Sequence, residues 1–250
     1  MSISDDFSNG VLDPVWRLEG PAGTAASLGT NATDAYLSLV TPDGDYDIYG
    51  SNNSSRAMQD TADTDFQIST RFLTTPTEKY QIQGLLVEQN ADNWIRFDTY
   101  SNGKKLFAYA AITIDGVTSQ QLRVRIPEGT APYLRVTREG DTWTMEYSID
   151  GSIWTTAGSF THVMAVSAVG VYAGNTGAAT GYTGEVDYFE NSADPILDED
   201  GTITPVNMPP VAVDDPGFVT AADTPLVITS ATELLANDSD PDGDAFGITS

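Results

Sequence analysis

The sequence predicts an all-β protein with a sandwich architecture, and three observations lead to this fold class. Short runs rich in Val, Ile, Thr, Phe and Tyr recur through the first 190 residues. Gly, Asn, Asp and Pro separate these runs at turn-like intervals, as is typical of a β-sandwich. Helix signals, namely a capping residue followed by an apolar stripe, are nearly absent. We therefore expect at least eight strands and no helix in this part of the chain.

The expected strands alternate apolar and polar residues, which is the period of two that a half-buried strand shows. In chain order they cover residues 66–73, 81–89, 94–100, 105–114, 133–139, 142–150, 166–174 and 184–190. Asn102-Gly103 predicts a tight hairpin after the third strand, because both residues accept the positive φ that such turns require. Gly140 and Asp150-Gly151 mark two further hairpin bends.

The composition excludes several classes of function. The chain has 36 acidic and 11 basic residues, a formal charge of −25, and no cysteine. Such a surface repels nucleic acid and anionic membranes, because phosphate binding depends on Lys and Arg. No apolar run approaches the ~20 residues of a membrane span. We expect no nucleic-acid partner, no membrane insertion and neither disulfides nor a thiolate metal site, whereas divalent cations suit this charge.

Composition also divides the chain into three parts. The β-rich domain should end near Asn191 and cover residues 1–191. Residues 192–210 are acidic, contain Pro and lack periodicity, as a linker does. Apolar alternation resumes over residues 211–250. From Asn191 onward the chain has 12 Asp and Glu and neither Lys nor Arg, so the linker and the last part are strongly acidic.

Motifs along residues 3–190 resemble those of a concanavalin A-like jelly-roll domain. They are Asp5-Asp6-Phe7, Asn93-Trp94-Ile-Arg-Phe97, Tyr147-Ser-Ile-Asp-Gly-Ser-Ile-Trp154 and Asp187-Tyr-Phe189. The resemblance is closest to the group found at the C-terminus of β-xylosidases and in secreted bacterial proteins. It implies two packed antiparallel sheets. Members of the group bind sugars, serve as accessory modules or have no known ligand, so the resemblance specifies the fold more than the function.

A second resemblance begins at NMPPVAVDD (207–215) and continues through LLANDSDPDGDAFGIT (234–249). These segments are similar to the start of the cadherin-like repeats of large bacterial RTX-type adhesins. Such repeats have about 100 residues, as in an Ig-like sandwich, so the resemblance implies that residues 211–250 are a truncated, incomplete unit. The resemblance implies a monomeric head of a longer chain, extracellular or on the cell surface. The N-terminus has no Sec signal features, which agrees with type I secretion.

The strand 94–100 carries the candidate ligand site. Trp94, Arg96, Asp98 and Tyr100 share one face, and the expected hairpin places Tyr109 beside them. Aromatic faces next to planar hydrogen-bonding groups suit a polysaccharide or a cell-surface glycan. Polar contacts from neighbouring strands are expected from Arg71, Gln81 and Gln83. The alternative is that these aromatics are ordinary outer-sheet residues covered by loops.

The segment EVDYFE (185–190) resembles the acidic motif of laminarinase-like β-glucanases. A retaining glycosidase needs two carboxyl groups about 5 Å apart. Side chains alternate along a strand, so Glu185 and Asp187 share a face and Glu190 points away unless a β-bulge intervenes. In that family the motif lies mid-chain, whereas here it lies on the last strand. We expect a non-catalytic module; a glycoside hydrolase using Glu185 and Glu190 and a purely structural spacer are the alternatives.

Calcium is the one cofactor we expect. The last strand of a jelly roll often returns beside the first, and related sugar-binding sandwiches hold calcium at this junction, which implies Asp5, Asp6 and Asp187 as ligands. A second acidic group contains Asp238, Asp240, Asp242 and Asp244. It begins like an EF-hand loop, but Thr249 occupies the position of the bidentate Glu, so an EF-hand is rejected. For both groups the alternative is a set of solvated acids.

Overall fold

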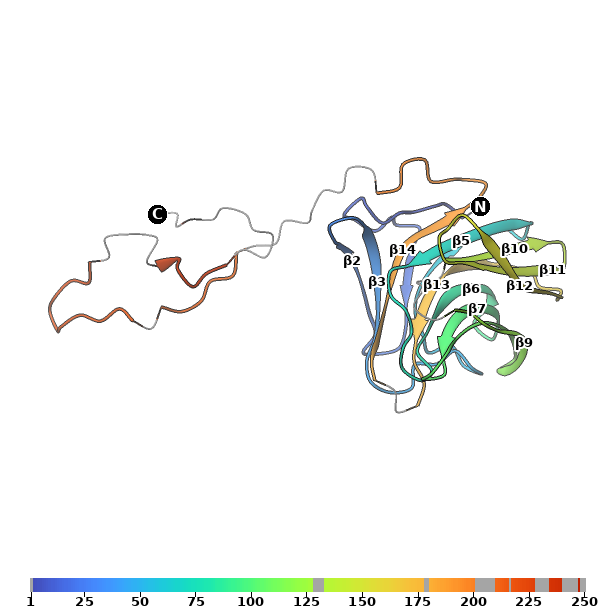
Figure 1. Ribbon diagram of the computed structural model, residues 1–250, viewed down its shortest axis with the longest axis horizontal. Helices are drawn as coiled ribbons and strands as arrows, with labels where there is room; N and C mark the ends of the chain where they lie inside the picture. The colour runs from blue at the N-terminus through green and yellow to red at the C-terminus, as the bar shows by residue number, and fades with distance from the viewer. Residues whose placement is uncertain are drawn as a thin grey trace. The chain divides into compact units, whose positions relative to one another are not determined.

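The structure is a computed structural model that describes residues 2–127, 133–177, 180–200, 210–215, 217–227, 234–239 and 247. The chain separates into two units, Met1–Thr204 and Pro205–Ser250. Fourteen strands run through the described part of the first unit (Figure 1). None of the described segments forms a helix that could cross a membrane.

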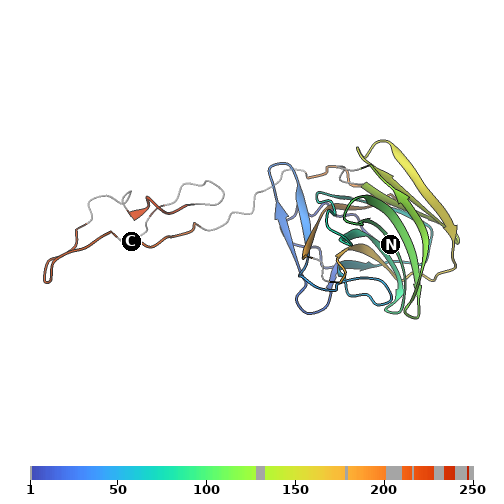
Figure 2. The same ribbon diagram turned by 60° about the horizontal axis from the view of Figure 1, so that its bottom comes forward.

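The strands of the first unit form two antiparallel sheets of seven strands each, drawn as two layers in Figures 1 and 2. The first, which we call the β7 sheet, has the order β1 (Arg17–Glu19), β4 (Ser55–Asp60), β13 (Ala168–Gly174), β6 (Ile82–Asn90), β7 (Asn93–Ser101), β8 (Leu106–Ile114) and β9 (Val117–Arg125). The second, the β14 sheet, has the order β12 (Trp154–Thr161), β11 (Thr142–Ser148), β10 (Tyr133–Glu139), β5 (Phe66–Phe72), β14 (Tyr182–Asn191), β3 (Ala35–Thr41) and β2 (Ala25–Thr30). The predicted all-β sandwich is confirmed.

The hairpin expected at Asn102-Gly103 joins β7 to β8. Gly103 has a φ of 82°, and the carboxamide Oδ1 of Asn102 accepts hydrogen bonds from the backbone N–H groups of Lys104 and Lys105. The turn sets the register in which Tyr100 pairs with Phe107 and Asp98 pairs with Tyr109. The outward-facing residues of the two strands therefore lie side by side.

Six strands were not expected: β1, β2, β3, β4, β9 and β12. The edge strands β9 and β12 explain part of this difference. Their residues are mostly exposed or half-buried, so their side chains lack the clean alternation by which a strand is detected in sequence. The missing signal reflects their place at the sheet edges, where only one side of each strand is paired.

The main core lies between the two sheets. Ile95 and Phe97 on β7 point into it, as do Val136 on β10 and Val186 and Phe189 on β14. Burial of these apolar side chains between two sheets supplies the main driving force for the fold.

A second, smaller core covers the opposite face of the β7 sheet. It contains Ile48, Met58, Ile82, Leu86, Trp94, Ala168 and Tyr172. Ile48 belongs to residues 42–54, which we call the covering segment. Backbone N–H groups of this segment bind the neighbouring strands and loops: Tyr46 N donates to Asn175 O and Gly50 N to Thr118 Oγ1, each at 2.9 Å. The centre of the β7 sheet is thus buried on both faces.

The chain continues along the first unit after β14. Ser192 N donates to Gln67 O at 3.0 Å, and the buried Ala35 N donates to Asp200 Oδ1 at 2.8 Å. Residues 192–200, expected as the start of a linker, therefore make defined contacts with the sandwich. In the second unit, Val211 and Ser239 form an isolated bridge, and Val213 N donates to Asp238 Oδ1 at 2.8 Å.

Candidate functional site

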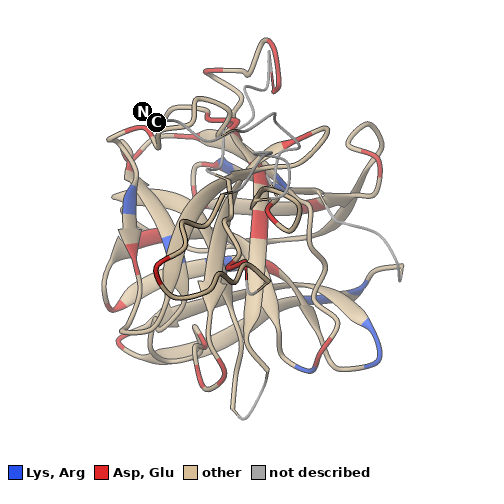
Figure 3. Ribbon diagram, turned by 90° about the vertical axis from the view of Figure 1, so that its left-hand side faces the viewer, with Lys and Arg blue, Asp and Glu red and all other residues tan. Residues whose placement is uncertain are grey.

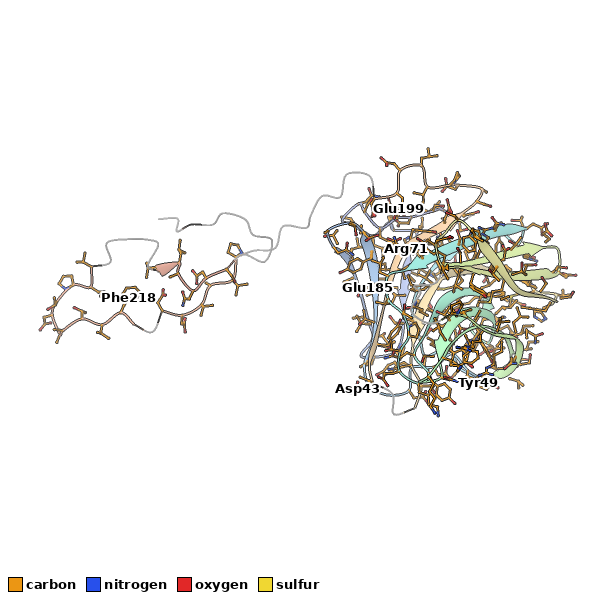
Figure 4. All side chains as sticks on the ribbon, in the orientation of Figure 1. Asp43, Tyr49, Arg71, Glu185, Glu199 and Phe218 are labelled. Atoms are coloured by element: carbon orange, nitrogen blue, oxygen red, sulfur yellow. The ribbon has the colours of Figure 1, made fainter. Side chains whose placement is uncertain are left out.

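A pocket of about 400 Å³ opens on the outer face of the β7 sheet, beside the second core. Its lining comes from β6–β9, from the covering segment and from two other loops: Asp47, Tyr49, Tyr80, Ile82, Arg96, Tyr100, Tyr109, Gln120 and Thr176. A volume of this size lies in the range of about 300–1,000 Å³ typical of small-ligand sites. Tyr49, which marks the pocket, is labelled in Figure 4.

A buried ion pair fixes the floor of the pocket. Arg96 donates from Nε to Asp98 Oδ2 at 2.8 Å and from Nη2 to Asp98 Oδ1 at 3.3 Å. The hydroxyl of Tyr172 donates to Asp98 Oδ2 at 2.9 Å. Asp47, from the covering segment, lies 3.6 Å from Arg96 Nη1. The guanidinium therefore has one orientation and two carboxylates to balance its charge.

These contacts set the charge states of the pocket. Burial works to lower the pKa of Arg96, but Asp98, Tyr172 and Asp47 raise it above its ordinary value, so the guanidinium stays charged. Burial raises the pKa of Asp47, although Arg96 opposes this shift. Burial also raises the pKa of Tyr109 to about 12, which keeps its hydroxyl protonated and able to donate a hydrogen bond.

Aromatic side chains make the walls. The rings of Tyr100 and Tyr109 meet edge to face with centroids 5.5 Å apart, and the guanidinium of Arg96 lies 5.0 Å from the centroid of Tyr109. Tyr49 is 58% exposed and Tyr80 is 42% exposed, so parts of both side chains are accessible to a ligand, although the ammonium of Lys79 lies over the Tyr80 ring, 4.7 Å from its centroid. Tyrosine rings beside polar groups can stack on the apolar face of a sugar and hydrogen-bond its hydroxyls.

The structure brings together three of the predicted ligand residues, Arg96, Tyr100 and Tyr109, and Asp98 is hydrogen-bonded to Arg96. Trp94 is only 1% exposed and packs in the second core, contrary to the expectation that it contacts a ligand. The covering segment explains the difference, because it buries the part of the sheet where Trp94 lies.

Three other residues expected at the site lie elsewhere. Gln83 lies two residues before Leu85 on β6, so it faces the same side as this main-core residue. Its carboxamide forms two hydrogen bonds with Thr74. Gln81 is buried and accepts hydrogen bonds from the backbone of residues 77 and 78. Arg71 belongs to β5 in the other sheet, where it pairs with Asp187. Alternation within one strand does not show which strands are neighbours or to which sheet a strand belongs. The positions of these three residues therefore could not be predicted from the sequence.

Sequence reasoning missed the pocket residues that come from loops, namely Asp47, Tyr49, Tyr80 and Thr176, as well as Gln120 on β9. Loop residues carry no periodicity that would assign them to a face. The available signal was the run Asp45-Tyr-Asp-Ile-Tyr49, where two tyrosines lie in an acidic, Gly-containing loop.

The EVDYFE segment lies on β14 and contains a β-bulge. The register against β5 shifts between Val186 and Tyr188, so Asp187 is the extra residue. Val186 and Phe189 are three positions apart, yet both point into the main core. The alternation of inward-facing and outward-facing side chains is therefore shifted by one residue at the bulge. Glu185 and Glu190 consequently share the outer face of the β14 sheet. The pocket takes no residue from this strand.

The predicted return of the last strand beside the N-terminal segment is present, since Asp5 and Phe189 exchange two backbone hydrogen bonds of 2.9 Å. The side chain of Asp5, however, accepts hydrogen bonds from Phe7 N and Trp16 Nε1. Asp187 instead lies near Asp34 and Asp200, which are the acids that the described structure groups with it.

The other expected calcium ligands have different positions. Asp6 accepts a hydrogen bond from Asp200 N at 3.2 Å, which places it at the margin of that acidic group. Asp238 binds Val213 N in the second unit. Asp240, Asp242 and Asp244 lie outside the described residues.

Solved structures with the same fold include glycoside hydrolases. A GH43 protein of the xyloglucan locus of Bacteroides ovatus (TM-score 0.62, 18% identity) covers 76% of this chain, which in turn spans 39% of that protein. A xylan β-1,4-xylosidase from Bacillus halodurans gives a TM-score of 0.60 at 15% identity, with 76% and 39% coverage. A family 16 endo-glucanase from Bacteroides ovatus gives 0.55 at 11% identity, covering 76% of this chain and 99% of its own.

At these identities the likeness concerns the fold alone. No curated protein matches this chain. The family model described as "Beta xylosidase C-terminal Concanavalin A-like domain", by contrast, matches residues 4–189, which is nearly the whole sandwich. The chain belongs to the family of concanavalin A-like domains found at the C-terminus of β-xylosidases.

Proposed function

We propose that the sandwich is a non-catalytic module that binds a neutral glycan in the pocket on the β7 sheet. The observation that carries this proposal is the combination of exposed tyrosine rings, Tyr49 and Tyr80, with a rigid polar floor at Arg96. An immobilised floor lowers the entropic cost of binding, because its hydrogen-bonding groups are already oriented. Membership in a β-xylosidase domain family supports a carbohydrate ligand.

The charges in and around the pocket favour a neutral ligand. Asp98 and Asp47 balance the guanidinium of Arg96, so this cation is not available to pair with a uronate. Acidic residues are widespread over the described strands and loops (Figure 3), and the chain carries a net charge of −25. A polymer of the same sign would be repelled. Xylo-oligosaccharides and xyloglucan, substrates in the names of the structural neighbours, are the first candidates.

Calorimetric titration of the full chain tests the proposal. The ligands are xylo-oligosaccharides, xyloglucan and β-glucan oligosaccharides, with oligogalacturonate as the anionic comparator. We expect saturable binding of a neutral ligand, weakened about tenfold by Tyr49→Ala, the loss typical of one aromatic contact. Tyr49 is mostly exposed, so its removal should leave the melting temperature unchanged.

The matched control is Tyr36→Ala, since Tyr36 is a half-buried tyrosine on β3 in the other sheet. Equal weakening by both substitutions would contradict the assignment of the pocket. Tighter binding of oligogalacturonate would overturn the neutral class. A complete absence of binding across the panel would support a purely structural spacer instead.

A glycoside hydrolase is the second candidate, and the bulge at Asp187 is the observation that favours it, because it places Glu185 and Glu190 on one face. That face lies on the sheet opposite the pocket, which argues against it. Assaying the same panel for product release decides between the two. Turnover that disappears in Glu185→Gln would establish the enzyme and reject the binding module.

We further propose that the domain acts as the head of a secreted or surface-attached bacterial adhesin. The resemblance of residues 207–249 to cadherin-like repeats supports this context, as does the acidic composition after Asn191. Detection of the protein in the culture medium or on intact cells of the native host, rather than in the cytosol, is the corresponding test.

A further inference from the structure

A group of acidic side chains lies at the bulge of β14, away from the glycan pocket. One carboxylate oxygen from each of Asp34, Asp187 and Asp200 lies within 4.8 Å of the other two. Figure 4 shows Arg71 and Glu199, which flank this group, well separated from Tyr49 at the pocket. The group is therefore independent of the proposed glycan site.

The charges of this group are poorly balanced. Arg71 Nη1 contacts Asp34 Oδ1 at 2.8 Å and Asp187 Oδ2 at 2.9 Å, which leaves Asp200 without its own cation among the described ion pairs. One guanidinium thus faces three carboxylates. Burial and the neighbouring acids raise the pKa of Asp187 to about 6, even though Arg71 opposes the shift.

A second observation points to a missing partner. Asp187 is fully buried, yet its Oδ1 has no hydrogen-bond partner, while its Oδ2 is taken by Arg71. A buried carboxylate oxygen without a donor is destabilising unless another group satisfies it. The β-bulge explains why Asp187 lies in this group. It inserts Asp187 as an extra residue in β14, close to Asp34 and Asp200.

We propose that Asp34, Asp187 and Asp200 hold a divalent cation, with calcium as the preferred ion. Calcium binds carboxylate oxygens at about 2.3–2.6 Å, so ligands on opposite sides of one ion lie up to about 4.6–5.2 Å apart. The three oxygens lie no more than 4.8 Å apart, which is compatible with that span. Magnesium has shorter bonds, about 2.0–2.1 Å, requires a near-ideal octahedron and usually retains several waters, so it suits a site built from protein carboxylates less well.

The site joins segments far apart in the sequence. Asp34 immediately precedes β3, Asp187 lies on β14, and Asp200 follows the sandwich, where its Oδ1 already binds Ala35 N. A cation at this position would tie residues 192–200 to the β14 sheet. It differs from the predicted set because the carboxylate of Asp5 is engaged by Trp16 and Phe7.

Calcium titration of the full chain, after treatment with EDTA and dialysis, tests this site by calorimetry and by thermal melting. We expect a calcium-binding event that depends on Asp34 and Asp187, together with a calcium-dependent rise in melting temperature. Asp187→Asn and Asp34→Asn should each weaken binding at least about tenfold, since affinity follows the number of charged ligands. Asp34 is less buried than Asp187, so its variant decides the matter if Asp187→Asn does not fold.

Two control variants make the result specific. Asp92→Asn and Asp115→Asn each remove an exposed acid of the first unit outside the group, and both should keep the calcium affinity of the parent chain. Failure of calcium to bind the parent chain would overturn the proposal. So would calcium binding that survives Asp34→Asn and Asp187→Asn, or a larger response to magnesium than to calcium. None of these outcomes bears on glycan binding.

Discussion

At the scale of the single residue, the carboxylate of Asp98 accepts two hydrogen bonds from Arg96 and one from the hydroxyl of Tyr172. Both Asp98 and Tyr172 are fully buried, and Arg96 is nearly so. A buried ion pair adds little to stability compared with an apolar pair, but removal of one partner is costly because the other charge remains buried. The residue thus fixes the orientation of the pocket floor.

Asp98→Ala should reduce the free energy of unfolding by about 3–5 kcal/mol, the cost of an uncompensated buried charge. Tyr172→Phe removes one hydrogen bond to the same carboxylate and should cost only about 1 kcal/mol. Urea unfolding of both variants measures these losses. Equal losses would mean that Asp47 alone balances Arg96, and that the pocket floor does not depend on Asp98.

At the scale of the element, β6 has no room for a side chain where Gly84 pairs with Asp98 on β7. A Cβ on Gly84 would lie 2.2 Å from Phe97 O and 2.6 Å from Asp98 Cα, and both atoms belong to the backbone of β7. Only a residue without a side chain permits this contact. Gly84 on β6 therefore determines how the backbone of Asp98 lies, and Asp98 in turn holds Arg96 in the pocket floor.

Gly84→Ala should cost about 1–3 kcal/mol, because the added methyl group displaces the backbone of β7. It should also weaken glycan binding by moving Asp98. Gly140→Ala is the control: its φ of +57° is strained for alanine, but nothing lies within 4 Å of the added carbon. Denaturation midpoints and calorimetry compare the two. Unchanged glycan affinity in Gly84→Ala would contradict the link between β6 and the pocket.

Several elements were predictable from the sequence and others were not. The alternation of residues 94–100 predicted that Ile95 and Phe97 face the main core and that their neighbours lie on the opposite face of the sheet, as found. Alternation could not show that a distant loop carries Ile48 onto the outer face and buries Trp94. Nor could it locate the extra residue in β14, because a bulge depends on the partner strand rather than on local composition.

At the scale of the whole molecule, the first unit extends past the last strand. Asp194 Oδ2 accepts a hydrogen bond from Ser4 N at 3.1 Å, and Asp200 Oδ1 accepts one from the buried Ala35 N. Asp200 itself is 7% exposed. Residues 192–200 thus contribute hydrogen bonds to the sandwich, although their composition is that of a linker.

A chain that ends at Asn191 should be less stable than one that ends at Asp200. Loss of the acceptor for the buried Ala35 N costs about 1–3 kcal/mol, and each kcal/mol lowers the melting temperature of a domain of this size by about 2–4 °C. Calorimetric melts in EDTA isolate this effect from any bound cation. Identical melting temperatures would show that residues 192–200 contribute nothing to the fold.

The covering segment has a consequence for how this domain could diversify. It contributes Asp47 and Tyr49 to the pocket, while Ile48 between them anchors the segment to the sheet. The proposed ligand contact at Tyr49 and the anchor at Ile48 are therefore adjacent in the sequence. Exchange of Tyr49, with Ile48 retained as the anchor and Asp47 retained as a partner of Arg96, would change the proposed ligand contacts without disturbing the framework, much as loop grafting does on other β-scaffolds.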